Sequence, residues 1–436
     1  MRFFRLITVC LIVLLAFANF ASRTLAADKK ASDAVMDFTK LDALAKKRVG
    51  AGSRVALVAE SSELLKGIDG LEPAESGRIP NYLRAIANLP NAVKPMARLV
   101  KTFLYGGTLA PELKMSMGLK IAQLHASPYV AAHLQRFLKA SERGQKMLVC
   151  LRSNDFAAMP VAEQMAVKYA ELLTADVHGV SDEDFQKTRA YFNDSQIVEL
   201  TMTVCFFNYF TRFCEGLNLP VEAWALDTPA TKSTKKYEPP AARIALISDE
   251  EMNAISDVFA ASRSNTSPAS GLGLGIANSQ RAMIQVPDMY AAWRAYGTAA
   301  REYAEVSREI KLHVSFAVSM ANGCRYCTLH QVLGLRRLNV DPAKLMAMKK
   351  DDSRLTPREL TAVTFARKST AMPAGITDDD YEKLKREFKE QGALEILLQT
   401  CNFAYMNRFT DGLRLPSEDE AIRVYREIYG GDFRAK

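Results

Sequence analysis

Two cysteines and a histidine lie close together in the stretch Ser319-Met-Ala-Asn-Gly-Cys-Arg-Tyr-Cys-Thr-Leu-His330. Their spacing places Cys324, Cys327 and His330 on one face of a helix. The Asn322-Gly323 pair favours a turn, so we expect Cys324 at a helix N-terminus. The unpaired N–H groups and the positive dipole end there favour a thiolate, and the imidazole can take its proton. The pattern predicts a redox-active dithiol.

Two other interpretations of the cysteine pair stay open. A CxxC motif is half of many zinc sites, but structural zinc usually takes four ligands, and only Cys324, Cys327 and His330 gather here. Free cysteines also pack well in cores, where the pair would be inert. Both alternatives compete with the redox hypothesis.

The residues around the pair resemble a known superfamily. Ser315-Phe-Ala-Val-Ser319, followed by Asn322-Gly-Cys-Arg-Tyr-Cys327, resembles the alkyl hydroperoxidase D-like, carboxymuconolactone decarboxylase superfamily, an all-α group. Redox members of this group carry a CxxCxxxH motif with a glutamate upstream. In this sequence the histidine position of that motif holds Gln331, one place after His330. The glutamate position holds Leu312, and the nearest upstream carboxylate is Glu309.

The resemblance implies roles for four residues. In family members the second cysteine attacks the peroxide, and the first resolves the resulting sulfenic acid to a disulfide. By position, Cys327 is then peroxidatic and Cys324 is resolving and faces the reductant. His330 would deprotonate Cys327, with Glu309 orienting it. The resemblance implies no metal, flavin or other cofactor, an external dithiol reductant, and a homo-oligomer.

The composition is that of a globular protein with a targeting segment. The net charge of +8 is spread along 436 residues, and no nucleic-acid-binding motif accompanies it. Residues 1–26 combine Arg2 and Arg5, an apolar run and small residues at the end, which is typical of a secretory signal peptide. An uncleaved membrane anchor is the alternative, although the run is short for a spanning helix. We expect export, to the periplasm if the host is a Gram-negative bacterium.

A long internal repeat divides the mature chain. Residues 206–220 match residues 402–416, with Tyr209 and Arg212 falling on Tyr405 and Arg408 at one constant spacing. We therefore predict a tandem duplication of one alkyl hydroperoxidase D-like helical domain. The first copy spans residues 27–227, the linker residues 228–242 and the second copy residues 243–436. We expect Arg212 and Arg408 to be scaffold residues, at an interface between the copies.

The first copy lacks the dithiol. Ser127 stands at the position of Cys324 and Val130 at that of Cys327, so this copy is degenerate. His133 and Glu112 still match His330 and Glu309. Because both persist without cysteines, the histidine and the glutamate are also candidates for structural roles. One dithiol site per chain is expected.

Apolar spacing and capping residues predict helices throughout. Residues 112–124 and 309–320 carry apolar residues at three- and four-residue intervals. Thr356-Pro-Arg-Glu359 has the pattern of a capping box, and Thr377 and Ser181 open helices in the same way. Pro128 directly after Ser127 favours a helix start there, which supports the same start at Cys324. The fold class is all-α.

The remaining candidates point to structure. We expect His313 to be a surface histidine rather than a second base, and Tyr326 to point away from the dithiol and pack. Cys205, Cys214 and Cys401 have the apolar surroundings of inert core thiols. Residues 262–274, which include the glycines from Gly271, are expected to be a mobile loop rather than a phosphate-binding loop.

The sequence therefore favours an exported thiol-dependent peroxidase or thiol–disulfide oxidoreductase that uses Cys324 and Cys327, with a peroxide or disulfide as substrate. Two alternatives remain. One is a non-catalytic helical binding or scaffold protein, and the other is an enzyme of the carboxymuconolactone decarboxylase type, a chemistry that does not depend on the CxxC motif.

Overall fold

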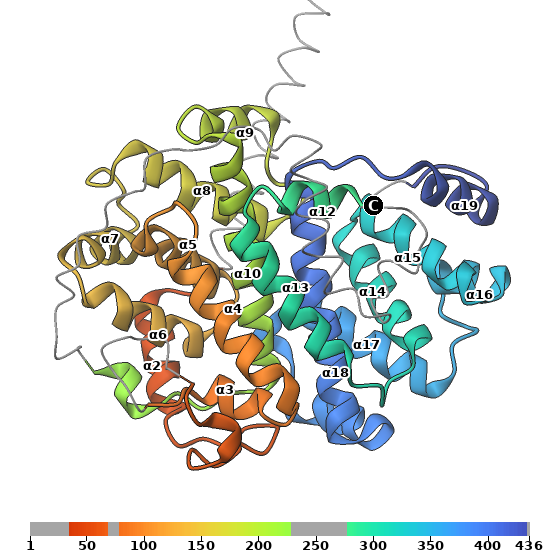
Figure 1. Cartoon of the computed structure of the whole chain (residues 1–436), viewed down its shortest axis with the longest axis horizontal. Coiled ribbons are helices and arrows are strands. Elements are labelled where there is room, and N and C mark those ends of the chain that lie inside the picture. The colour runs from red at the N-terminus through yellow and green to blue at the C-terminus, as the bar shows by residue number, and fades with distance from the viewer. Residues whose placement is uncertain (1–34, 69–77, 228–276, 434–436) are drawn as a thin grey trace, which may run out of the picture.

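The computed structural model describes residues 35–68, 78–227 and 277–433. Within these ranges the chain forms α-helices and short 3₁₀ turns and no strand, so the all-α prediction is confirmed (Figure 1). We call residues 35–227 the first half and residues 277–433 the second half. The helices of the first half are α2 (Phe38–Lys47), α3 (Asn81–Ile86), α4 (Val93–Tyr105), α5 (Pro111–Leu124), α6 (Pro128–Lys139), α7 (Glu142–Ser153), α8 (Val161–Ala175), α9 (Asp182–Arg189) and α10 (Asp194–Gly216).

The second half repeats this order of helices. Its first five helices, α12 to α16, follow the order of α3 to α7. Helix α17 corresponds to α8, and α18 corresponds to α9 and α10 joined across a bend at Lys389. The tandem duplication itself stays a prediction from the sequence repeat. The helices are α12 (Asn278–Met283), α13 (Pro287–Arg301), α14 (Arg308–Asn322), α15 (Arg325–Arg337), α16 (Pro342–Lys350), α17 (Pro357–Ala371), α18 (Asp378–Gly412) and α19 (Asp419–Tyr429).

The local helix signals are confirmed. The predicted helices at 112–124 and 309–320 are α5 and α14. Thr356 and Thr377 each form a capping box with the acidic residue three places on, and Ser181 caps α9 with its side chain. These caps satisfy N–H groups that the first turn of a helix leaves unpaired.

One hydrophobic core runs through both halves. Its buried members include Phe206 and Phe213 of α10 together with Leu394, Leu397 and Phe409 of α18. In Figure 1 these two helices lie side by side through the centre of the molecule, with α4 and α13 beside each other in front. The halves therefore share their interior and are not two separately packed domains.

Aromatic side chains fill the contact between the halves. Trp293 of α13 stacks on Tyr405 of α18 with ring centroids 3.9 Å apart, and its edge meets Tyr209 of α10. The hydroxyl of Tyr209 also hydrogen-bonds that of Tyr296. Stacked and edge-on rings bury large apolar areas in defined geometry, which fixes the halves relative to each other.

Two buried arginines cross this contact in opposite directions. Arg212 donates to the backbone carbonyl of Thr370 at 3.3 Å, and Arg408 donates to that of Thr174 at 3.1 Å. Each arginine thus reaches the last turn of a helix in the other half. The expectation that this pair lies at an interface between the halves is confirmed.

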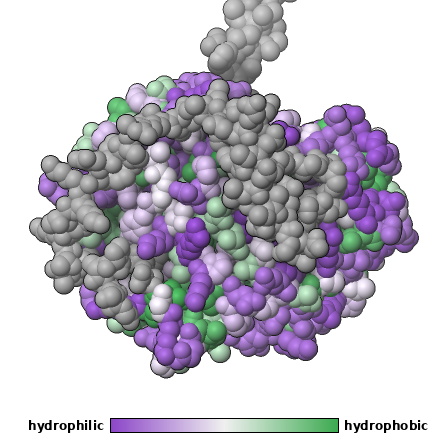
Figure 2. Space-filling model, in the orientation of Figure 1, coloured by the Kyte–Doolittle hydropathy of each residue, from purple (hydrophilic) through white to green (hydrophobic). Residues whose placement is uncertain are grey.

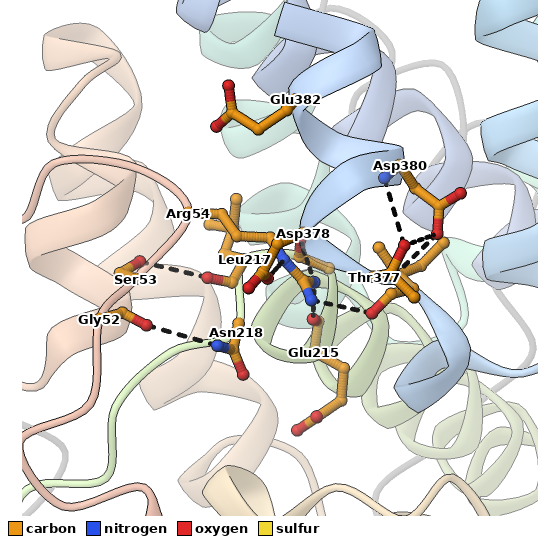
Figure 3. A network of polar contacts seen from close by, with 12 residues as sticks. Gly52, Ser53, Arg54, Glu215, Leu217, Asn218, Thr377, Asp378, Asp380 and Glu382 are labelled. Carbon is orange, nitrogen blue, oxygen red and sulfur yellow. Dashed lines mark hydrogen bonds and ion pairs between the residues drawn. The ribbon is translucent and has the colours of Figure 1, made fainter.

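A segment before α3 also joins the halves (Figure 3). Arg54 donates to the carbonyl of Glu215 at 3.0 Å in the first half, to Asp378 at 2.7 Å and to the carbonyl of Ile376 at 2.8 Å in the second half. The neighbouring Ser53 donates to the carbonyl of Leu217. One guanidinium therefore links the end of α10 to the start of α18.

Several predicted segments lie outside the described residues. They are the signal peptide at 1–26, the linker at 228–242 and the loop at 262–274. Among the helices that are described, none has the length and apolar content needed to span a membrane. The face shown in Figure 2 is mostly hydrophilic where it is coloured, with apolar residues in small separate areas.

Candidate functional site

Cys324 lies at the turn between two helices. Helix α14 ends at Asn322, Gly323 follows in the left-handed region with φ 71°, and α15 begins at Arg325. Cys324 is the N-cap of α15, and its Sγ accepts the backbone N–H of Cys327 at 3.3 Å. The predicted helix start at Cys324 is confirmed, and the sulfur takes the place of the oxygen that usually caps a helix.

Both sulfurs share one hydroxyl. Thr410 Oγ1 of α18 lies 3.3 Å from Cys324 Sγ and 3.5 Å from Cys327 Sγ. Cys324 is fully buried and Cys327 is only 3% exposed, and both are free thiols. Phe403, Met406 and Leu415 pack against the pair. The structure therefore brings the two predicted cysteines together in closed, largely apolar surroundings.

Burial decides the protonation of Cys324. It raises the pKa of this thiol well above its ordinary value, and the neighbouring Cys327 and Asp411 raise it further, against a smaller opposing effect of Thr410. The expectation that the helix N-terminus favours a Cys324 thiolate is wrong for this closed geometry. Desolvation of the charged form outweighs the helix dipole, whose effect amounts to about 1 kcal/mol.

Asp411 is a residue of this site that the sequence interpretation missed. Its carboxylate lies close enough to Cys324 to raise the pKa of that thiol, and its Oδ2 atom is buried without a hydrogen-bond partner among the described residues. Burial raises the pKa of Asp411 to about 6, although the thiol, His178 and Arg408 oppose the rise. A carboxylate with a pKa near 6 is suited to accept a proton at neutral pH.

The first half also places an acidic residue beside the N-cap residue, but there the N-cap is a serine and the acid is a glutamate. Ser127 is the N-cap of α6, as Pro128 predicted, and its hydroxyl donates to Glu215 at 2.8 Å. Glu215 occupies the place of Asp411 in the internal repeat, so the acidic residue was visible in the sequence in both copies. In the first half Arg48 pairs with this carboxylate at 2.6 Å.

The first half also contributes to the dithiol site. His178, in the loop between α8 and α9, has its Nε2 atom 3.2 Å from the carbonyl oxygen of Gly323. The same residue lowers the pKa of Asp411, whereas Asp176 raises it. The half without the CxxC pair therefore helps to set the charge beside Cys324.

The polar contacts of His330 lie outside the dithiol. Its Nδ1 atom lies 2.6 Å from the carbonyl oxygen of Tyr326, and its Nε2 atom lies 2.6 Å from Glu418 Oε2. The Tyr326 ring stacks on the imidazole at 4.2 Å, and its hydroxyl donates to Glu418 at 3.0 Å. Tyr326 thus packs as expected. Both nitrogens of His330 are engaged outside the dithiol, which does not support its assignment as the base for Cys327.

The first half repeats this arrangement without cysteines. His133 Nε2 lies 2.9 Å from Glu222, which also accepts the hydroxyl of Tyr129 at 2.9 Å. Burial raises the pKa of Glu418, but the contact with His330 outweighs it and lowers the pKa to about 2. The tyrosine–histidine–glutamate sets therefore position α6 and α15 in both halves. Glu222 and Glu418 were missed, although they too are related by the internal repeat.

Glu309 lies at the far end of α14. At the usual rise of about 1.5 Å per residue, this helix separates Glu309 from the turn at Gly323 by roughly 20 Å. Leu312, at the glutamate position of the family motif, packs against Gly334 of α15, beyond His330. Glu309 instead pairs with Lys344 at 2.9 Å. The geometry does not place Glu309 in a relay to the dithiol.

His313 is buried, so the prediction of a surface histidine is wrong. It is fully enclosed between α14, α16 and α17. Its Nδ1 atom lies 3.3 Å from Glu359 Oε1, and its Nε2 atom lies 3.6 Å from Glu309 Oε1. The apolar spacing of α14 already places position 313 beside buried neighbours such as Phe316 and Ala317, a signal that the interpretation did not use.

The other cysteines of the central helices are core residues. Cys205, Cys214 and Cys401 are fully buried, and burial raises the pKa of each thiol. Inert thiols are expected from such surroundings.

Part of the second half matches a known protein family. Residues 287–368, from the start of α13 into α17, match the carboxymuconolactone decarboxylase family. The match includes Cys324 and Cys327 and ends before Thr410 and Asp411. A solved structure of the debrominase Bmp8, a cysteine-to-alanine variant in complex with 2,3,4-tribromopyrrole, is similar at 22% identity over 42% of this chain and 98% of that one, with a TM-score of 0.35. No curated protein matches the chain.

Proposed function

Since residues 287–368 carry a domain of the carboxymuconolactone decarboxylase family, we propose that the chain is an exported thiol-dependent oxidoreductase of the peroxidase type. One observation carries the proposal. Cys324 and Cys327 share the Thr410 hydroxyl at the start of α15, beside the Asp411 carboxylate. Two thiols and a proton acceptor are the groups that disulfide formation requires.

The reaction proceeds in three steps. Cys327 attacks the peroxide ROOH, the O–O bond breaks, and the products are a Cys327 sulfenic acid and the alcohol ROH. Cys324 then attacks the sulfenic sulfur, a disulfide forms, and water leaves. An external dithiol finally reduces the Cys324–Cys327 disulfide by exchange and is itself oxidised. One peroxide is reduced for each reductant dithiol that is oxidised.

Asp411 serves the second step. Cys324 must lose its proton before it attacks, and burial holds its pKa high. The Asp411 carboxylate lies beside this thiol, and its pKa of about 6 suits it to accept the proton. His178 and Arg408 lie near enough to stabilise the ionised carboxylate. His330 and Glu418 hold α15 in place, and Glu309 takes no part in this scheme.

The burial of the two cysteines limits which peroxides can reach them. Phe403, Met406 and Leu415 cover the sulfurs, and neither cysteine is open to solvent. A peroxide therefore enters when these side chains move, which favours a small or apolar peroxide over a bulky charged one. Export to the periplasm and assembly as a homo-oligomer belong to the proposal and rest on residues 1–26 and on the family resemblance.

A non-catalytic scaffold is the second candidate, and the same burial favours it. Cys324 is protonated and enclosed, as an inert core thiol would be. The two candidates differ in whether the pair reacts with peroxide while the protein is folded. A decarboxylase of the family type remains the third, and only the family name favours it.

Thiol titration separates the candidates. Purified mature protein is titrated before and after one equivalent of hydrogen peroxide, with Cys324→Ser and Cys327→Ser variants alongside. Loss of two thiols, mapped to a Cys324–Cys327 disulfide, is the expected result. Peroxide turnover that persists in Cys327→Ser at the rate of the unsubstituted protein contradicts the mechanism. No thiol loss over minutes in the unsubstituted protein favours the scaffold.

A further inference from the structure

A second group of ionisable residues lies away from the dithiol. Glu309, His313 and Glu359 present one ligand atom each, and these atoms lie within 4.8 Å of one another. They come from α14 and α17, and α16 adds Lys344 between the two carboxylates. The group is roughly 20 Å from Gly323 along α14, so it is independent of the proposed redox chemistry.

His313 is the feature that ordinary packing leaves unexplained. Its side chain is fully buried, and neither ring nitrogen has a hydrogen-bond partner within the described part of the chain. Both nitrogens instead face carboxylate oxygens, at 3.3 Å on Glu359 and 3.6 Å on Glu309. Buried polar groups are nearly always satisfied, and a ligand is one of the recognised explanations when they are not.

The charge of the group favours a cation. With a neutral imidazole, two carboxylates and one ammonium leave a net negative charge beside the fully buried side chain of His313. Lys344 Nζ lies 2.9 Å from Glu309 and 2.7 Å from Glu359, which is the position between the carboxylates that favours positive charge.

We propose that Glu309, His313 and Glu359 form a binding site for a divalent transition-metal ion such as Zn²⁺, which enters by displacing the ammonium of Lys344. One imidazole and two carboxylates are donors that this ion accepts, and three protein ligands leave a position for water. Lys344 is partly exposed on a flexible stem, so its ammonium can turn to solvent. The bound ion joins α14 to α17.

The first half provides a natural comparison within the same chain. It keeps both carboxylates, as Glu112 and Glu163, but has Ser116 in place of His313 and Met147 in place of Lys344. There Ser116 contacts the Met147 sulfur and Glu112 accepts the Ser141 hydroxyl. Neither the imidazole nor the ammonium is present, so the site belongs to the second half alone.

The test uses full-length mature protein without an affinity tag and with Cys324→Ser and Cys327→Ser, because thiols would bind zinc themselves. After removal of metal by a chelator, ZnCl₂ and MnCl₂ are titrated by calorimetry. We expect one Zn²⁺ per chain. His313→Ser, the residue of the first half, lowers the affinity by roughly 100-fold. Lys344→Met, also the residue of the first half, raises it because the competing ammonium is gone.

The control is Glu112→Gln in the first half, which leaves zinc affinity unchanged. Circular dichroism verifies the fold of each variant, and a higher melting temperature with zinc in the Lys344→Met variant is a readout independent of the titration. Zinc binding that is equally strong in His313→Ser overturns the proposal. Absence of saturable binding in both the parent and Lys344→Met also overturns it, and the group is then a buried ion-pair cluster only.

Discussion

Asp411 is the residue whose substitution separates a chemical role from a structural one. The Asp411→Asn variant removes the proton acceptor of Cys324, so disulfide formation after peroxide slows by roughly 10²-fold at pH 7. In the unsubstituted protein the same step slows as pH falls below about 6, where Asp411 takes up a proton. Stopped-flow measurement of the disulfide-forming step across pH tests both. An inflection near pH 6 that persists in Asp411→Asn contradicts the assignment.

The same substitution, Asp411→Asn, is expected to raise the free energy of unfolding although it slows the reaction. The pKa of Asp411 rises from 3.8 to about 6 on folding, so the folded protein binds this proton more tightly than the unfolded chain. The free energy of unfolding therefore falls as pH rises from about 4 to 6, and the ionised carboxylate costs on the order of 3 kcal/mol above that. Urea unfolding at pH 8 is expected to show Asp411→Asn more stable than the parent. A less stable variant would mean that Asp411 is a packing residue.

Glu418 affects the free energy of unfolding with the opposite pH dependence to Asp411. Its hydrogen bonds with His330 and the Asn278 N–H lower its pKa to about 2, so these contacts stabilise the fold above about pH 4.5, and this stabilisation is lost as pH falls through the folded pKa. Glu418→Gln is expected to lower the free energy of unfolding by about 1–3 kcal/mol at pH 7, with a smaller difference near pH 4. Glu222→Gln in the first half is the matched control. If thiol oxidation slows in Glu418→Gln but not in the control, His330 takes part in the reaction as the base for Cys327.

The chemistry-bearing residues were predictable only where they are close in sequence. Cys324, Cys327 and the helix start follow from local spacing and turn residues. Thr410 and Asp411 follow from none of these, because they reach the site through packing of α18 against α15. The internal repeat did show an acidic residue at 215 and 411, but only the structure shows it beside Ser127 and Cys324.

At the scale of elements, the turn between α14 and α15 is the feature that positions the dithiol. Gly323 has φ 71°, a conformation that other residues adopt at a cost of about 1 kcal/mol. Gly323→Ala is expected to lower stability by roughly that amount and to misplace Cys324, which slows thiol oxidation. Chemical denaturation and thiol titration measure the two effects.

Gly430 provides the matched control for that turn. It ends α19 with φ 69°, and a Cβ there would meet no atom within 4 Å. Gly430→Ala should cost similar stability and leave thiol oxidation unchanged. Equal oxidation rates in both variants would show that the site tolerates displacement of the turn.

Most elements were predictable from caps and apolar periodicity, and the exceptions have a physical cause. Capping boxes and first-turn prolines are local, so the starts of α17, α18, α6 and α9 were correct. The bend at Lys389 places a lysine at φ 57°, an unfavourable conformation that no sequence signal marks. It interrupts α18 between two helical parts, which correspond to α9 and α10 of the first half.

For the whole molecule, the shared core predicts cooperative unfolding. The main core joins α10 to α18, and Arg212, Arg408 and Arg54 cross between the halves. Differential scanning calorimetry is expected to show one transition, because neither half keeps its interior when the other unfolds. Two well-separated transitions would contradict a shared core. Sequence showed the repeat but not this dependence, which lies in contacts between residues far apart in the chain.

Of the two tryptophans of the chain, only Trp293 lies at the contact between the halves. Trp224 lies beside His133 in the first half, whereas Trp293 is stacked on Tyr405 and meets Tyr209 where the halves join. In a Trp224→Phe variant, all indole emission therefore comes from Trp293 at the contact between the halves. Quenching and a spectral shift of this single fluorophore would then report separation of the two halves. The signal can be followed during peroxide addition, so it would show whether the halves separate while the thiols are oxidised.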